Sequence, residues 1–450
     1  MTQTTSSTIQ KMEYMDVKKL VLNMSFPIMI SMVIQALYNI VDSIFVARIS
    51  PEALTAVSLC YPVQTIIIAF ACGTAVGFNT LLSRFLGEKR IKEANNTVMH
   101  GMLLSLCNWI FFALIGILFS NTYLKYYTNN AEILAMGNAY IRICTFFSFG
   151  VFIQITYERI MQATGNAIYN MVMQSLGAIV NIILDPIFIF GYFGFPALGV
   201  TGAAIATVIG QTMGMLCGYL LAKYKVDDLE VKISNFKLDK TIITRIYKVG
   251  IPAILMQSIL SFMTVFMNRI LVSFSDLAIS VFNVYYKLQN FMNMAVLGIS
   301  NALIPILSYN CGAKRNDRVK EAIRFSLILS IGIMFFGTIV FELFPHQLMS
   351  LFSANEEMYV LGIPCLRIIS FSFVFAGINM ILCSCLQALN RANESLIITL
   401  ARQLVVLIPL TYVLAHLFGL QIAWFAFVIT ECICAIGSFL VWDKVKIELG

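Results

Sequence analysis

Residues 176–194 read LGAIVNIILDPIFIFGYFG, an apolar run interrupted by Asn181 and Asp185, one helical turn apart, and by Pro186. A stretch of this length can cross the hydrocarbon core of a bilayer as a helix, which takes about 20 residues. The rest of the chain has the same character: 59% of its 450 residues are hydrophobic, 12% are charged, and the mean hydropathy is +0.84. Soluble domains carry about 25% charged residues. The sequence therefore predicts an all-α integral membrane protein.

Apolar segments long enough to span a bilayer recur twelve times along the chain. The 11 cysteines are scattered through these segments without the spacing of a metal site or a redox motif, so we expect them to pack as small apolar side chains. We expect twelve transmembrane helices at about residues 20–47, 55–82, 94–120, 132–157, 166–191, 197–222, 243–270, 277–303, 319–343, 358–383, 395–416 and 419–441.

Lys and Arg are distributed unequally between the connections on the two sides. Of 30 such residues, 24 fall in alternate connections that begin with the amino terminus, Arg159 and Arg402 among them. Cytoplasmic connections carry the Lys and Arg excess of a membrane protein. We therefore expect a multi-pass protein of the inner (plasma) membrane with both termini in the cytoplasm. The net charge of +7 follows this topology, so it does not indicate a nucleic-acid partner.

The two halves of the chain contain similar motifs in the same order. Each motif of the second half follows its counterpart in the first half at the same distance along the sequence, the distance from Gly87 to Gly312. GEKRIKEA (87–94) matches GAKRNDRVKEA (312–322), and MQATGN (161–166) matches LQALNR (386–391). Six spans in each half, both starting on the same side, make a parallel internal repeat of two six-helix bundles. Such a duplication is typical of transporters that rock to give alternating access, although a duplicated bundle without a pathway is the alternative. We expect an N-terminal lobe at 1–222, a cytoplasmic linker at 223–242 and a C-terminal lobe at 243–450.

Polar side chains align on one face of each of two predicted spans. Positions three or four apart share a helical face, and a polar group inside a span usually faces a cavity or a partner. Pro186 has no N–H, which leaves the carbonyl of Ile182 without its helical donor. The aligned residues are Ser31, Gln35, Asn39 and Asp42 in span one, and Asn170, Gln174, Asn181 and Asp185 in span five.

Four residues of the N-terminal lobe lie at a similar distance from the outer ends of their predicted spans, so we expect them at the same depth in the membrane. They are Asp42, Tyr140, Asp185 and Thr207. Oxygen ligands of this kind suit Na⁺, and a close carboxylate pair in a low dielectric equally suits a shared proton. The repeat-equivalent residues of the two acids are Met267 and Leu410. We therefore expect a cation-binding site in the N-terminal lobe, with no other metal and no organic cofactor.

Simpler roles for these residues remain open at this point. Asp42 could cap a helix or extend to the interface, and Asp185 could pair permanently with Arg142. Lys287 and Arg367 have no acidic partner in sight other than Glu431, so Lys287 either lines a central cavity or extends to the interface. The candidates for the substrate cavity are Gln35, Asn39, Gln174, Arg142 and Lys287.

Several motifs resemble those of the multidrug and toxic compound extrusion (MATE) transporters, and most closely their MepA-like bacterial branch. They are FPIMISMVIQALYNIVDSIFVARIS (26–50), QATGN (162–166), NIILDPIFIFG (181–191) and LGVTGAAIATVIGQ (198–211). The resemblance implies a monomeric, cation-coupled antiporter that expels organic, mostly cationic compounds in exchange for Na⁺ or H⁺. It also implies that Asp42, Asn181 and Asp185 carry the cation, with Thr207 and Tyr140 at the matching positions of spans six and four. Branches with acids in spans seven and ten differ, because Gln257, Asn268 and Asn379 stand there in this chain.

Two other classes of function compete with a drug antiporter. A flippase for lipid-linked oligosaccharides, in the same superfamily, would need several cationic residues around its cavity, and only Arg142, Lys287 and Arg367 are candidates. An integral-membrane enzyme is disfavoured, because the three histidines lie near span ends without a metal cluster or a His–acid pair. We therefore expect a transporter rather than an enzyme.

Overall fold

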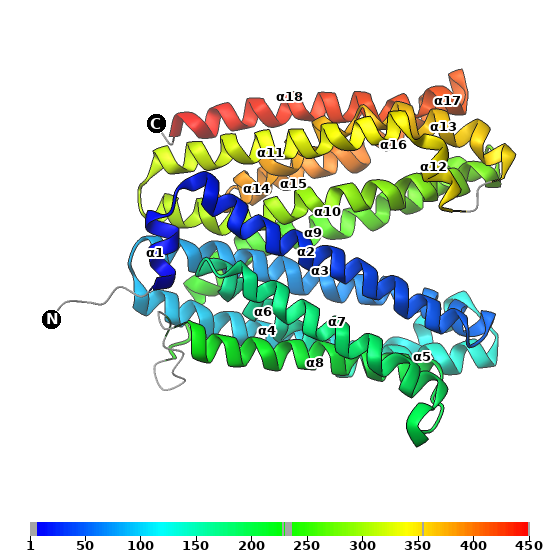
Figure 1. Cartoon of the computed structure of the whole chain (residues 1–450), viewed down its shortest axis with the longest axis horizontal. Coiled ribbons are helices and arrows are strands. Elements are labelled where there is room, and N and C mark those ends of the chain that lie inside the picture. Colours follow the sequence, from blue (N-terminus) through cyan, green and yellow to red (C-terminus); the bar gives the residue numbers. More distant parts are fainter. Residues whose placement is uncertain (1–6, 227–228, 230–235, 353–354, 449–450) are drawn as a thin grey trace. The chain divides into compact units, whose positions relative to one another are not determined.

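The protein is built from helices throughout the part of the chain that the structure describes, residues 7–226, 229, 236–352 and 355–448 of a computed structural model (Figure 1). Among the residues described, ten helices are long and apolar enough to cross a membrane. Two further spans are each made of two helices that meet at a bend, Ala131–Phe146 with Phe149–Ala163 at 42° and Glu356–Ser370 with Phe373–Ala388 at 48°. Counting each bent pair as one span gives the twelve spans predicted from the sequence.

The first six spans occupy the amino-terminal half of the chain. A short helix, α1 (Ser7–Tyr14), precedes them, and a 3₁₀ turn, η1 (Tyr192–Gly194), follows the fifth. The spans are α2 (Val17–Ala47), α3 (Pro51–Gly87), α4 (Ile91–Tyr127), α5 (Ala131–Phe146) with α6 (Phe149–Ala163), α7 (Ala167–Phe190) and α8 (Val200–Lys225).

The other six spans follow the same order in the carboxyl-terminal half. The eleventh is interrupted by a π-helical segment, η3 (Ala401–Val405), and the short helix α12 (Pro345–Ser350) lies between two spans. Another short helix, α17 (Leu420–Ala423), begins the twelfth span. The spans are α9 (Lys240–Val272), α10 (Asp276–Gly312), α11 (Asn316–Leu343), α13 (Glu356–Ser370) with α14 (Phe373–Ala388), α15 (Ala392–Leu400) with α16 (Leu407–Phe418), and α18 (Phe425–Glu448).

The repeat extends to the ends of individual helices. Ser50 caps α3 by accepting from the backbone N–H of Ala53, and its repeat equivalent Ser275 caps α10 by accepting from that of Ala278. Lys89 and its repeat equivalent Lys314 both adopt the left-handed backbone conformation, with φ of 59° and 57°. Non-glycine residues rarely adopt this conformation. The two halves therefore share their turns as well as their spans.

Contacts divide the chain into two compact units, and the division cuts through two helices. One unit comprises Met1–Met15 and Ile30–Ile254, and the other comprises Asp16–Met29 and Leu255–Gly450. The sequence prediction instead placed the division in the linker, at residues 223–242. Of that linker, residues 227–228 and 230–235 lie outside the described part of the chain.

Close helix crossings account for the division. In the first unit a Cβ atom on Gly73 of α3 would lie 2.6 Å from the backbone nitrogen of Ile254 in α9. In the second unit a Cβ on Gly298 of α10 would lie 3.0 Å from that of Met29 in α2. Glycine permits such close approach of two backbones. These four residues form two repeat-related pairs, so the first part of each lobe-opening helix packs in the other unit.

The end of the linker lies against α4. Asn96 donates through Nδ2 to the backbone oxygen of Lys237 (3.0 Å), and the backbone N–H of Asp239 donates to Nε2 of His100 (2.9 Å). The backbone N–H of Thr241 donates to Asp239, and this bond lowers the pKa of the Asp239 carboxyl below its ordinary value. The segment that enters α9 is thus fixed to the first unit.

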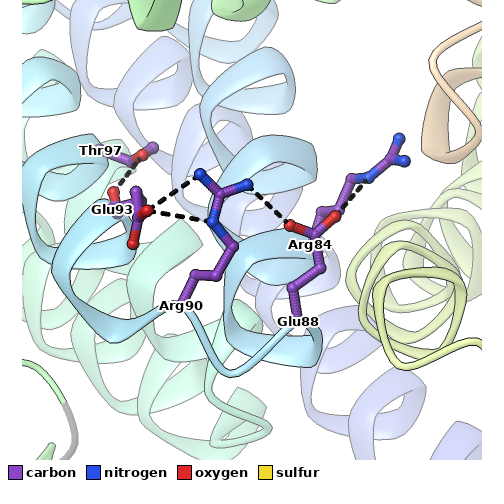
Figure 2. Close-up of polar contacts among 5 residues, drawn as sticks. All are labelled: Arg84, Glu88, Arg90, Glu93 and Thr97. Carbon is purple, nitrogen blue, oxygen red and sulfur yellow. Dashed lines mark hydrogen bonds and ion pairs between the residues drawn. The ribbon is translucent and has the colours of Figure 1, made fainter.

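A chain of ion pairs closes the turn between α3 and α4 (Figure 2). Arg84 bonds Glu88 at 3.1 Å, and Arg90 bonds both Glu88 (3.2 Å) and Glu93 (2.9 Å). The carboxylates of Glu93 and Glu88 raise the pKa of the Arg90 guanidinium above its ordinary value. This turn is exposed, so we assign it a role in fixing the helix ends rather than in binding.

Candidate functional site

Asn181 and Asp185 lie on the buried face of α7, as their spacing predicted. Asp185 is fully buried, Asn181 is 3% exposed, and Nδ2 of Asn181 donates to Oδ1 of Asp185 at 3.3 Å. Pro186 lies inside the helix, which continues to Phe190 and ends at Gly191 with a left-handed φ of 78°. The proline therefore changes the hydrogen bonding of this turn without ending the span.

Three oxygen atoms in this region have no hydrogen-bond partner within the described residues. They are Oδ2 of Asp185, Oδ1 of Asn181 and Oδ1 of Asp42, and all three are buried. Asp42 on α2 lies in the same compact unit as Asp185. Buried polar atoms in folded proteins nearly always have a partner. These oxygens are therefore acceptors available to a small cation or a proton.

Tyr140 and Thr207 lie in the same unit, on α5 and α8. Tyr140 is 2% exposed and packs in an apolar cluster with Val46 and Ile189, where its hydroxyl accepts a hydrogen bond from Nε2 of Gln64 at 3.0 Å. Gln64 is a neighbour that the sequence analysis did not place in the site.

A small cavity of about 30 Å³ lies beside Asn181 and is lined in part by Gln174 and Thr207. This volume holds one or two water molecules. Tyr38 and Gln154 also line it. Thr207 and Gln174 thus face the same small space as Asn181, whereas Asn39 is exposed and Gln35 is half-buried.

Glu158 on α6 is a buried acid that sequence reasoning missed. It is 6% exposed and accepts hydrogen bonds from Nε2 of Gln174 at 2.7 Å and from Nε2 of Gln154 at 3.1 Å. The predicted fourth span ended at residue 157, one position before this acid, and its neighbour Arg159 was assigned to a cytoplasmic connection. That assignment is wrong, because Arg159 is 6% exposed within α6 and bonds Gln162 at 2.7 Å.

The cationic candidates have partners of their own. Arg142 is exposed on α5 and donates through Nε to Oγ of Ser120 at 3.3 Å, and no ion pair joins it to Asp185 in the part of the chain described. Lys287 is exposed on α10 with its Nζ 5.9 Å from the centre of the Phe352 ring. Their assignment to a substrate cavity stays a prediction.

Two further cations differ from the prediction, Arg367 in its partner and Arg402 in its place in the chain. Arg367 has an acidic partner in Glu342, at 3.8 Å, which the sequence analysis did not find. Arg402, which was counted with the cytoplasmic connections, lies in η3 within the eleventh span and pairs with Glu431 of α18 at 3.3 Å. The assignment of Arg402 to a connection is therefore wrong.

No group of three or more His, Cys, Asp or Glu side chains that could hold a metal ion occurs among the described residues. A site around Asp185 would instead combine two carboxylates with amide and hydroxyl oxygens. Such hard oxygen ligands suit an alkali cation better than a transition metal.

Comparison with known families settles the class of this membrane protein. The model of the MatE family matches the chain twice, over residues 27–187 and over residues 252–413. The chain belongs to the MatE family. Members of this family are transporters, so this MATE protein is a transporter and not an enzyme. The two matches start at Pro27 and Pro252, which are equivalent positions of the internal repeat.

Relatives of this MATE protein match almost its whole length. It is 27% identical over 428 residues to the multidrug export protein MepA of Staphylococcus haemolyticus (strain JCSC1435), covering 94% of this chain and 93% of the relative. It is 26% identical over 426 residues, with the same shares covered, to MepA of Staphylococcus aureus (strain bovine RF122 / ET3-1).

A solved structure of a multidrug resistance MATE family transporter of the MOP superfamily, in an outward-facing conformation, matches this chain with a TM-score of 0.93. The identity is 26%, and the match covers 99% of each chain. The predicted fold of twelve transmembrane helices in two six-helix bundles is therefore confirmed.

Proposed function

We propose that this MATE transporter is a secondary active antiporter that exports organic, mostly cationic compounds in exchange for Na⁺ or H⁺. Asp42, Asn181 and Asp185 bind the coupling ion, with Thr207 and Tyr140 beside them. Binding of the ion from outside releases the exported compound, and the two lobes alternate in access. The protein acts as a monomer in the inner membrane, with both termini in the cytoplasm.

The observation that supports this proposal is the trio of unpartnered oxygens on Asp185, Asn181 and Asp42 within the described residues. A buried carboxylate with an unused oxygen is costly inside a membrane unless it has a partner for part of the time. Either a proton on the acid pair or a Na⁺ ion held by all three oxygens removes that cost. Export of drugs is supported by the name of the MepA relatives, multidrug export protein.

The energy available from one coupled charge is sufficient for export. A positive charge that enters across 100 mV releases about 2.3 kcal/mol. A tenfold concentration gradient costs about 1.4 kcal/mol. One charge exchanged for a neutral compound therefore sustains a gradient on the order of fortyfold.

Ethidium efflux from cells that express Asp42→Asn or Asp185→Asn tests the proposed coupling residues. Both substitutions keep the side-chain shape and remove the charge, so we expect ethidium accumulation to rise to the level of cells without the transporter. Glu132→Gln, at an exposed acid in the first turn of α5, is the matched control and should export like the wild type. Wild-type efflux in both Asp variants would show that these carboxylates do not couple transport.

A further inference from the structure

A second polar cavity, larger than the one beside Asn181, lies within the carboxyl-terminal unit. Its volume is about 180 Å³, and its walls come from α9, α10, α14, the eleventh span (α15, η3 and α16) and α18. Methionine and aromatic side chains form much of the wall, among them Met256, Met263, Met380 and Phe427. An engineered apolar cavity of about 150 Å³ is known to hold a benzene molecule. This cavity therefore has room for one aromatic ring and a short polar group.

The charged part of the wall is an ion pair. Nε of Arg402 lies 3.3 Å from Oε1 of Glu431, and the two side chains are 15% and 12% exposed. Nδ2 of Asn379 donates to Oε2 of Glu431 at 2.7 Å, and Oδ1 of Asn379 accepts from Ser438 at 2.8 Å. The carboxylate is therefore held firmly from behind. The contact of the guanidinium, Nε to Oε1 at 3.3 Å, is longer than the charge-assisted hydrogen bonds of the strongest Arg–carboxylate pairs, which are about 2.8 Å.

Two polar atoms on the same wall have no hydrogen-bond partner within the described part of the chain. They are Oδ1 of Asn293 and Oγ1 of Thr430, and Thr430 is 1% exposed. An amide oxygen can only accept a hydrogen bond. The cavity thus offers an unused acceptor to a molecule that carries an N–H group.

The π-helical segment η3 places the guanidinium in this wall. The backbone N–H of Val406 bonds the oxygen of Ala401 at 2.9 Å, so one turn of the helix is wider than an α-helical turn. Such a widened turn shifts the side chains around it and often marks a functional site. Arg402 and Gln403, both in η3, line the cavity side by side.

The repeat relates this cavity to the small one beside Asn181. The repeat equivalents of Tyr38, Gln174, Gly177 and Ala178 are Met263, Thr399, Arg402 and Gln403, which all line the larger cavity. The ion pair thus introduces charge where the first unit has Gly177 and Ala206. The larger cavity therefore differs in chemistry from the small one, because a pair of opposite charges lines it and no charged residue among those described lines the small one.

We propose that the cavity between α9, α10, η3 and α18 binds a zwitterion that carries an ammonium and a carboxylate on one carbon, as in an aromatic amino acid. The ammonium bonds Glu431 and Oδ1 of Asn293, and the carboxylate bonds Arg402. Each buried charge then has an opposite partner, whereas a ligand with one charge would leave an excess charge in the cavity. The ring packs against the methionines and Phe427.

This inference goes beyond the proposed ion exchange and does not depend on it, because binding to purified protein involves no gradient. The test is binding of tritiated phenylalanine to the full-length protein in detergent, with competition by its methyl ester and by N-acetylphenylalanine. The ester keeps only the positive charge, and the N-acetyl derivative keeps only the negative charge. For the wild type we expect both to compete at least about tenfold less well than phenylalanine.

Single substitutions in the ion pair should invert this preference. Arg402→Gln frees Glu431, so the methyl ester should bind more tightly than phenylalanine. Glu431→Gln frees Arg402, so N-acetylphenylalanine should bind more tightly. A variant that is merely unstable loses all three ligands together and cannot reverse their order. Substituting the half-buried pair Arg391 and Glu394, 2.9 Å apart in the same unit and outside the cavity wall, with Gln controls for loss of charge.

Asn293→Leu keeps the ion pair and tests the site independently if either charge variant fails to fold. It removes one acceptor of the ammonium, so phenylalanine binding should weaken about fivefold. Absence of saturable phenylalanine binding to the wild type would overturn the proposal. Tighter binding of the ester than of phenylalanine to the wild type would also overturn it, because the cavity would then be a site for cations.

Discussion

At the scale of single residues, the burial of Asp185 could be predicted from the sequence and the burial of Glu158 could not. Asp185 and Asn181 were predicted to share a buried face because they are four residues apart in a long apolar helix, and the structure places them there. Glu158 was missed because a span predicted from hydropathy is usually ended where charged residues begin, here at Glu158 and Arg159. Hydropathy assigns the same value to an acid in water and to one held by two buried amides.

Glu158→Leu tests how much this buried acid stabilises the first unit. The substitution leaves the amide groups of Gln154 and Gln174 without their acceptor. An unsatisfied buried donor costs about 1–3 kcal/mol, so we expect a lower midpoint of thermal unfolding in detergent. Glu132→Leu, at an exposed acid of the same unit, is the control. An unchanged midpoint for Glu158→Leu would show that the two glutamines find other partners.

At the scale of elements, the structure departs from the predicted helices where helices cross or widen. A sequence pattern cannot show that α9 packs on α3 through Gly73, because the contact joins residues far apart in the chain whose pattern is apolar in any case. The π-helical segment η3 is likewise absent from the pattern, since its residues are compatible with an ordinary α-helix. Arg402 lies in this segment, inside the predicted span at 395–416, so the span was predicted correctly and only the counting of Arg402 with the connections was wrong.

Gly73→Ala tests the crossing of α3 and α9. The added methyl would lie 2.6 Å from the backbone nitrogen of Ile254 and 2.9 Å from its Cα, so the two helices must move apart. We expect a destabilisation of about 1–3 kcal/mol, measured as a fall in the thermal midpoint.

The control for this crossing is Gly332→Ala in α11, where an added methyl would meet no atom within 4 Å. Alanine favours a helix over glycine by about 1 kcal/mol, so this variant should be as stable as the wild type or more so. Equal midpoints for the two alanine variants would contradict a close crossing at Gly73.

At the scale of the whole molecule, the sequence predicted the architecture well because both halves of the chain carry the same motifs in the same order. The offset found in the loop motifs recurs in helix caps, in left-handed turns and in the starts of the two family matches. Asymmetry between the halves was harder to predict. The first unit keeps Asp42 and Asp185, and the second has Arg402 with Glu431 at positions that are not their repeat equivalents.

In the proposed mechanism, the acids of the first unit couple an inward cation gradient to export. Ethidium efflux from proteoliposomes, with Na⁺ and H⁺ gradients imposed separately, measures this most directly. We expect one of the two gradients to drive efflux by the wild type, and the same gradient to have no effect on Asp185→Asn. Efflux by Asp185→Asn that follows the gradient as the wild type does would contradict the account.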